Sequence, residues 1–126
     1  MNPLKATMMQ AVSGMQVQSQ RIGVTSENIS NADTPGYQRK VLTVEEGSGA
    51  DQFQSVRVSL DESQGEQRYD PNHPMADAEG YVTMSNVSLV TEMADMREAN
   101  RSYEANLNSF QQARSMYRSL LDILRR

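Results

Sequence analysis

Apolar residues in the last third of the chain recur at alternating steps of four and three, the heptad spacing of a coiled-coil helix. Neither proline nor glycine interrupts residues 86–124, so one continuous helix of roughly 57 Å is expected at 1.5 Å per residue. Ala99, Asn106, Ala113 and Leu120 form a parallel row that widens the apolar stripe. The predicted contact positions are Leu89, Met93, Met96, Asn100, Tyr103, Leu107, Phe110, Arg114, Tyr117, Leu121 and Leu124.

The first part of the chain shows the same spacing over residues 3–30, which predicts a second long helix. Pro3 fits its first turn, where the missing N–H is harmless. Gly14 and Gly23 each cost about 1 kcal/mol relative to alanine, so this helix is expected to need a partner. The C-terminal stripe, from this chain or from a neighbour, is the expected partner. The predicted contact positions are Leu4, Met8, Ala11, Met15, Gln18, Ile22, Thr25 and Ile29.

A turn is predicted directly after the first helix. Asn31 favours capping and turn geometry over a further helical turn, and Thr34 is pushed out of the helical region by the proline that follows it. Pro35 and Gly36 suit the centre of a type II turn, because glycine accepts the positive φ that this turn requires. The ring of Tyr37 is expected to anchor the turn. Pattern alone would favour an ordinary helix-to-strand connection.

The middle of the chain is predicted to form short strands at residues 41–44, 53–60 and 81–84, separated by polar loops. Ser85 or Asn86 is then expected to cap the C-terminal helix. These elements divide the chain into residues 1–40, 41–85 and 86–126. The predicted fold class is therefore mainly α: two long terminal helices form a coiled coil or bundle, with a small β-rich middle segment.

Composition supports a thin core and limits the possible partners. Only 37% of the 126 residues are hydrophobic and there is no tryptophan, which is low for a globular domain. The net charges of the three segments are +2, −7 and +1, and the acidic middle argues against nucleic-acid binding. The absence of cysteine excludes disulfides and thiol catalysis. Residues 1–20 lack a continuous apolar stretch, so no cleavable signal peptide is expected.

Candidate catalytic and metal-binding groups are sparse. His73 is the only histidine, and it lies between prolines without a cysteine to share a metal. Asp70, Asn72 and Asp77 fail as a calcium loop, because Pro74 occupies a ligand position and the central glycine is missing. No nucleophile elbow accompanies the histidine. The chain is therefore predicted not to be an enzyme and to hold no cofactor, metal ion or small-molecule substrate.

Several stretches resemble a known family. Ser26–Lys40 is similar to the signature that ends the N-terminal helix of bacterial flagellar rod and hook proteins, in which two residues separate Asn31 from Thr-Pro-Gly-Tyr. Tyr69–Val82, Asn86–Met96 and Arg101–Asn106 resemble the C-type basal-body rod protein, a subunit of the proximal rod. The similarity covers nearly the whole chain. Departures are small: Ser30 and Ser88 replace common residues, and the acidic middle is short.

The resemblance implies a structural subunit of the proximal rod, which crosses the periplasm and transmits torque from the motor to the hook. Such subunits leave through the flagellar type III export apparatus, and their terminal helices become ordered in a coiled-coil tube on assembly. The implied partners are further copies, other rod subunits and the membrane-ring or export-gate base of the rod. The expected assembly residues are the large side chains of both contact rows, Asn100, and the turn residues Asn31 and Thr34–Tyr37.

Two alternatives belong to other functional classes. A soluble cytoplasmic coiled-coil adaptor or export chaperone would explain both helical stripes, but it would leave the Thr-Pro-Gly-Tyr turn and the acidic middle unexplained. A hydrolase could use Asp70, Asp77 or Glu79 as paired carboxylates, and it is the least favoured of the three hypotheses.

Overall fold

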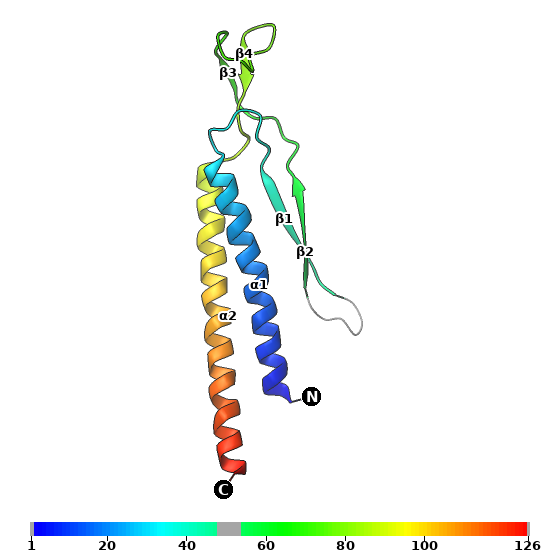
Figure 1. Cartoon of the computed structure of the whole chain (residues 1–126), viewed down its shortest axis with the longest axis vertical. Coiled ribbons are helices and arrows are strands. Elements are labelled where there is room, and N and C mark those ends of the chain that lie inside the picture. Colours follow the sequence, from blue (N-terminus) through cyan, green and yellow to red (C-terminus); the bar gives the residue numbers. More distant parts are fainter. Residues whose placement is uncertain (1, 48–53, 126) are drawn as a thin grey trace.

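Two long antiparallel helices make up most of the molecule in a computed structural model that describes residues 2–47 and 54–125 (Figure 1). Helix α1 spans Pro3–Ser30 and helix α2 spans Leu89–Leu124. Both chain ends lie at one end of the helix pair, and the middle segment lies at the other end and along α1 (Figure 1). The mainly α fold with a small β-rich middle is confirmed, and coiled-coil supercoiling stays a prediction. Neither of these helices is long and apolar enough to cross a membrane.

Local capping explains the limits of α1. The Asn2 side-chain oxygen accepts a hydrogen bond of 2.9 Å from the Leu4 N–H, which satisfies one of the open donors of the first turn. Pro3 follows in the first turn, as predicted. At the other end Asn31 terminates the helix, and its side-chain nitrogen donates to the Glu27 carbonyl at 2.8 Å. These local contacts are why the predicted bounds of α1 are confirmed.

The start of α2 was predicted wrongly. The helix begins at Leu89 after Ser88, rather than after Ser85 or Asn86. The Asn86 amide bonds to a distant segment instead: its nitrogen donates to the carbonyl oxygens of Asp61 and Ser63, at 2.9 Å each. Long-range hydrogen bonds therefore hold residues 85–88 in an extended path and delay the helix by two or three residues.

The two helices pack together, and two of the contact positions predicted on α1, Ala11 and Thr25, are buried, with 4% and 3% of their surface exposed. Asn28, which lies outside the predicted row, bonds to Glu92 of α2. On α2 the centre of the contact is the parallel row rather than the predicted one: Glu92, Ala99 and Ala113, seven or fourteen residues apart, are 1%, 0% and 4% exposed. The small alanine side chains in this row let the two backbones approach closely, which explains why this row, rather than the predicted row of larger side chains, lies at the centre of the contact.

A close approach of this kind is visible at Gly14. A Cβ atom placed there would lie 2.7 Å from the side-chain nitrogen of Asn106 on α2. At Gly23, by contrast, no atom of the described residues lies within 4 Å of such a Cβ.

We expect Gly23→Ala to raise the free energy of unfolding by about 1 kcal/mol through helix propensity alone. Gly14→Ala should gain less, because the Asn106 amide must move to accommodate the new methyl group. Urea titration followed by far-UV circular dichroism measures both values. Equal stabilisation by the two variants would contradict the close approach at Gly14.

Four short strands form two separate antiparallel pairs. Strand β1 (Lys40–Glu45) pairs with β2 (Ser55–Leu60), and β3 (Gln67–Tyr69) pairs with β4 (Tyr81–Thr83). The first pair runs along α1, and the second stands at the end of the molecule remote from the chain termini (Figure 1). The predicted strands at 41–44 and 81–84 are confirmed, and the one at 53–60 begins at Ser55, with residue 53 outside the described residues. Strand β3 was missed, because three residues carry no period-two pattern.

The apolar core is thin, as composition predicted. Among the described residues, the buried apolar side chains are Ala11, Val17, Val82, Ala99 and Ala113. Larger apolar side chains are exposed, including Ile123 at 66% and Leu124 at 72%. The helix pair therefore leaves most of its large apolar residues in contact with water.

Candidate functional site

The predicted turn after α1 has type II features. The Tyr37 N–H donates to the Thr34 carbonyl at 3.2 Å, and Gly36 has a φ of 78°. The Gly36 N–H donates to the carbonyl of Thr83 at 2.9 Å, which ties the turn to β4. The Thr34 hydroxyl bonds to the Asn31 side-chain oxygen at 3.1 Å. This turn sets the direction in which the chain leaves the helix pair.

Gly36→Val should disrupt assembly by straining this turn. Valine is disfavoured at positive φ, and the strain costs about 1–3 kcal/mol. Space is not the limiting factor, because a Cβ at this position would lie 3.5 Å from the Met75 methyl group, an ordinary contact. Rod formation and swimming are the readouts. Gly36→Asn is the control and should retain most function, since asparagine tolerates this conformation; normal rods with Gly36→Val would refute the role of the turn.

Tyr37 anchors the turn through its hydroxyl group, as the sequence predicted for this residue. The hydroxyl donates to the side-chain oxygen of Asn28 at 2.7 Å. Asn28 is only 1% exposed, and it also pairs with the backbone of Lys40, accepting from its N–H at 3.0 Å and donating to its carbonyl at 2.9 Å. Burial, and then the nearby Glu27, raise the pKa of Tyr37.

A buried carboxylate completes the link to the second helix. Glu92, in the first turn of α2, is 1% exposed and accepts from the Arg39 Nε and, at 3.2 Å, from the Asn28 side-chain nitrogen. Arg39 also donates to Asp95 at 3.3 Å. The hydrogen bond to Glu92 is the main cause that raises the pKa of Arg39. We refer to Asn28, Tyr37, Arg39, Glu92 and Asp95 as the junction cluster.

The junction cluster joins α1 and the turn that closely follows it to α2, which lies more than 50 residues further along the chain. Asn28 comes from α1, Tyr37 and Arg39 from the turn before β1, and Glu92 and Asp95 from α2. The Asn86 side chain adds a further link by accepting from the Arg39 N–H at 2.6 Å. The cluster therefore fixes the angle between the helix pair and the chain that leaves it.

In the loop between β3 and β4, the histidine and carboxylate side chains make structural contacts rather than a catalytic arrangement. The His73 ring accepts from the Met75 N–H at 3.0 Å, and the Asp77 carboxylate accepts from the N–H groups of Glu79 and Tyr81 at 2.9 Å each. These contacts shape the loop between β3 and β4. Within the residues that the structure describes, no group of three His, Asp or Glu side chains is placed to hold a metal ion.

The residues predicted to mediate assembly divide into two sets. One set is half-buried in the structure: Leu4, Met8, Met15, Ile22, Ile29, Met96, Leu107, Phe110 and Tyr117. The other set is exposed: Leu89, Met93, Asn100, Tyr103, Leu121 and Leu124. A contact of the exposed set with neighbouring subunits stays a prediction.

Sequence reasoning missed part of the exposed apolar surface and most of the junction cluster. Met9, Val12, Val90 and Ile123 are exposed apolar residues outside the predicted rows. Arg39 and Asp95 carried no pattern that would single them out. Glu92 lies seven positions before Ala99, in the row of α2 that also contains Ala113. A charged residue in this row was the one sequence signal for a role of Glu92 in the helix contact.

Comparison with known proteins covers the same elements. A family model described as flagella basal body rod protein matches residues 8–38, and one described as flagellar basal body rod FlgEFG protein C-terminal matches residues 78–123. The flagellar basal-body rod protein FlgC of Agrobacterium fabrum is 43% identical over 99% of this chain and 98% of its own length. The chain belongs to the FlgC family of flagellar basal-body rod proteins. FlgC of Salmonella typhimurium is 35% identical over 84% of this chain and 87% of its own length.

Membership of the FlgC family confirms the resemblance that the sequence motifs indicated. It places the chain among structural proteins of the flagellar basal body, which confirms that it is not an enzyme, and it does not favour the adaptor hypothesis. The two matched ranges correspond to α1 with its turn and to β4 with α2. Four of the five junction-cluster residues lie within them.

Proposed function

We propose that this chain is a subunit of the flagellar proximal rod that polymerises through its terminal helices into the shaft transmitting torque from motor to hook. The observation that carries this proposal is the exposed apolar surface of both helices. Met9 is 44% exposed on α1, and Met93 and Ile123 are 51% and 66% exposed on α2. Large apolar side chains exposed along both helices are the surface that neighbouring subunits would cover.

The thin core supports ordering on assembly. An isolated helix pair with so few buried apolar residues recovers little of the conformational entropy that ordering removes. Neighbouring rod subunits would supply the missing surface and complete a coiled-coil tube. In this proposal residues 1–40 and 86–126 form the tube and residues 41–85 lie outside it.

Export fits the same physical picture. A chain with weakly ordered ends passes through a narrow type III channel more easily than a stable domain does, and it needs no cleavable signal peptide. The proposed destination is the periplasmic rod, where the partners are further copies, other rod subunits and the membrane-ring or export-gate base. The junction cluster would transmit force between the tube and the middle segment, because it joins both helices to β1.

Fractionation tests the proposal directly. We expect the chain to co-purify with isolated basal bodies, and its deletion to abolish rod formation and swimming. A protein that stays in the cytoplasmic fraction of flagellated cells would instead be an adaptor or chaperone. That result would refute the proposed function.

Concentration-dependent folding gives an independent prediction. Far-UV circular dichroism of the dilute monomer should show much less helix than α1 and α2 contain, and helix should increase as sedimentation shows association. Full helicity in a dilute monomer would mean that the two stripes are satisfied within one chain. The adaptor hypothesis would then gain support.

A further inference from the structure

The C-terminal end of α2 extends beyond the start of α1. Helix α1 begins at Pro3, and close to this end the Lys5 ammonium lies 5.5 Å from the ring centroid of Tyr117 on α2. Helix α2 continues to Leu124, past the first turn of α1 (Figure 1). We call residues 116–124 the α2 overhang. It carries five exposed apolar side chains: Met116 at 60%, Leu120 at 43%, Leu121 at 37%, Ile123 at 66% and Leu124 at 72%.

Met116, Leu120, Ile123 and Leu124 form one face of the overhang, and Leu121 lies beside it. Their spacing of four, seven and eight residues places them on one side of a helix, and it is the spacing that helices use to bind grooves. Arg118, Asp122 and Arg125 fall on the opposite side. The overhang is therefore strongly amphipathic.

The apolar face of the overhang continues the face by which α2 binds α1. Leu120 lies seven residues after the buried Ala113, in the row that also contains Ala99 and Glu92. Along the helix pair this row is covered by α1, whereas Leu120 is 43% exposed. The α1 of its own chain does not cover it, and a second copy of the chain supplies a helix whose outer side carries an apolar groove.

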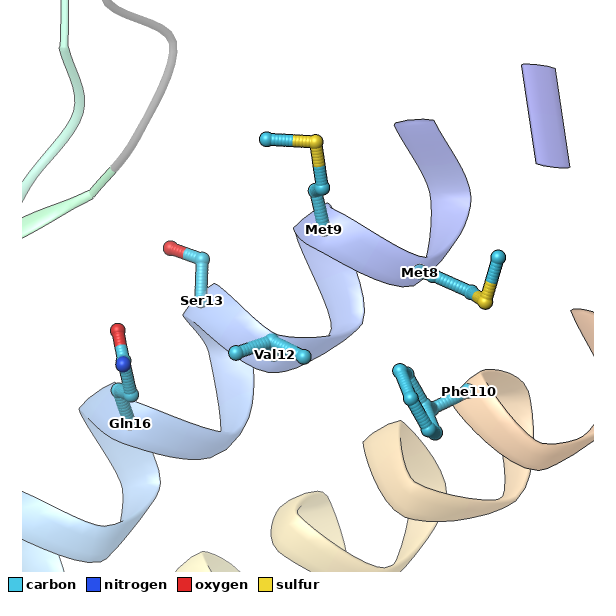
Figure 2. Close-up of a pocket in the computed structure, with 6 residues that line it drawn as sticks. All are labelled: Met8, Met9, Val12, Ser13, Gln16 and Phe110. Carbon is cyan, nitrogen blue, oxygen red and sulfur yellow. The ribbon is translucent and has the colours of Figure 1, made fainter. Parts of the chain in front are cut away.

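The outer side of α1 offers an apolar groove of suitable character. Met8, Met9 and Val12 of α1 and Phe110 of α2 line a pocket of about 250 Å³, with Ser13 and Gln16 at its edge. Figure 2 shows the Phe110 ring pointing from α2 toward α1, near Met8 and Val12. Met9 and Val12 are 44% and 38% exposed, and no charged residue lines the pocket. Flexible methionine side chains allow such a groove to adapt to its ligand.

We propose that the α2 overhang of one copy binds the Met8–Met9–Val12–Phe110 groove of a second copy. This inference rests on the proposed function and specifies one contact of the polymer. Groove and overhang lie roughly twelve residues apart on α2, so neighbouring copies are shifted along their axes by about 18 Å at 1.5 Å per residue. The two surfaces differ, so each added copy leaves one groove and one overhang available. Such a heterologous contact does not stop at a dimer, and it builds an open helical assembly when the rotation between copies does not close a ring.

Cysteine crosslinking tests this contact cleanly, because the chain contains no cysteine of its own. The full-length double variant Val12→Cys, Ile123→Cys is treated with a short bismaleimide, both in isolated basal bodies and as purified chain at high concentration. We expect covalent dimers and longer ladders from the double variant in both samples. Each single variant should remain monomeric. The matched control pair, Val12→Cys with Asp122→Cys, places its second cysteine on the charged face and should crosslink far less.

The outcomes separate this inference from the proposed function. Basal bodies that contain the double variant without crosslinked copies would overturn the contact and leave the rod assignment intact. Crosslinking by Ile123→Cys alone would show a symmetric contact, and capture of a different rod subunit alone would show another occupant; either result overturns the inference. A chain missing from basal bodies would overturn the proposed function itself, and the purified sample would then decide the contact.

A charge placed in the contact gives a second measurement. Ile123→Asp should weaken self-association of the purified chain by roughly tenfold or more, as loss of a central apolar anchor does in other interfaces. Ser115→Asp, away from the apolar face, should leave it unchanged. Sedimentation over a range of concentrations measures both, and equal association by the Ile123→Asp variant and the unmodified chain would overturn the inference.

Discussion

Replacing Glu92 with alanine should lower the free energy of unfolding by about 3 kcal/mol, the lower end of the range for breaking a buried ion pair. The carboxylate is 1% exposed and accepts hydrogen bonds from Arg39 and Asn28. Its removal leaves the guanidinium without its main partner and the Asn28 nitrogen with one acceptor fewer. Arg39 remains 23% exposed, so water can solvate part of its charge and the loss stays near the lower end.

Urea titration followed by far-UV circular dichroism measures this effect, at a protein concentration where helix content no longer rises. Glu98→Ala is the matched control, because Glu98 is an exposed residue of the same helix and should change stability by less than about 0.5 kcal/mol. We also expect Glu92→Ala to reduce rod incorporation, since the junction cluster holds β1 against both helices. Equal stability of the two variants would contradict this role of Glu92.

The elements that could be predicted from the sequence are those whose limits are set by neighbouring residues. Helix α1 is bounded by Asn2 and Asn31, and both residues cap it through local hydrogen bonds. The turn at Pro35 and Gly36 follows from one fixed φ and one positive φ. The start of α2 depends instead on Asn86 bonding across the fold to Asp61, and no local pattern indicates such a contact.

The heptad pattern correctly predicted that the two helices pack together, but it did not predict which residues of α2 lie at the centre of the contact. Mainly Leu, Met, Tyr and Phe defined the expected row on α2, yet Ala99 and Ala113 of the parallel row lie at the centre of the observed contact. Small residues permit the closest approach of two backbones, and large residues on either side then remain partly exposed. Counting large apolar residues therefore identified the surface available to neighbours more readily than the surface used within the chain.

The junction cluster was largely invisible to sequence reasoning because its two carboxylates come from α2, more than 50 residues from Arg39. Asn28 illustrates this point: it stands in a helix beside a turn motif and has no distinctive local role. In the fold its amide accepts from the Tyr37 hydroxyl and from the Lys40 N–H, and it donates to the Lys40 carbonyl and to Glu92. The oxygen and the nitrogen of this amide thus have two hydrogen-bond partners each. A side chain that replaced the donor with an acceptor would therefore leave buried polar groups without a partner.

Asn28→Asp should be as damaging as the loss of Glu92, although it changes a single side-chain group. It replaces the donor that faces the Lys40 carbonyl and the Glu92 carboxylate with an acidic oxygen. Two acceptors then face the new oxygen, one of them charged, in a site where Asn28 is only 1% exposed. A buried group left without its partner costs about 1–3 kcal/mol, and more when it is charged, so a loss of about 3 kcal/mol is expected.

Urea titration at neutral pH measures the loss, and Asn108→Asp, at an exposed position of α2, provides the control for the added charge. Motility should fall together with stability in Asn28→Asp and stay unchanged in Asn108→Asp. Because the cluster joins the helix pair to the chain that leaves it, a rod built from the Asn28→Asp variant should lose its fixed geometry at that joint before its helices separate. Unchanged stability and swimming in this variant would show that the buried amide does not hold the joint together.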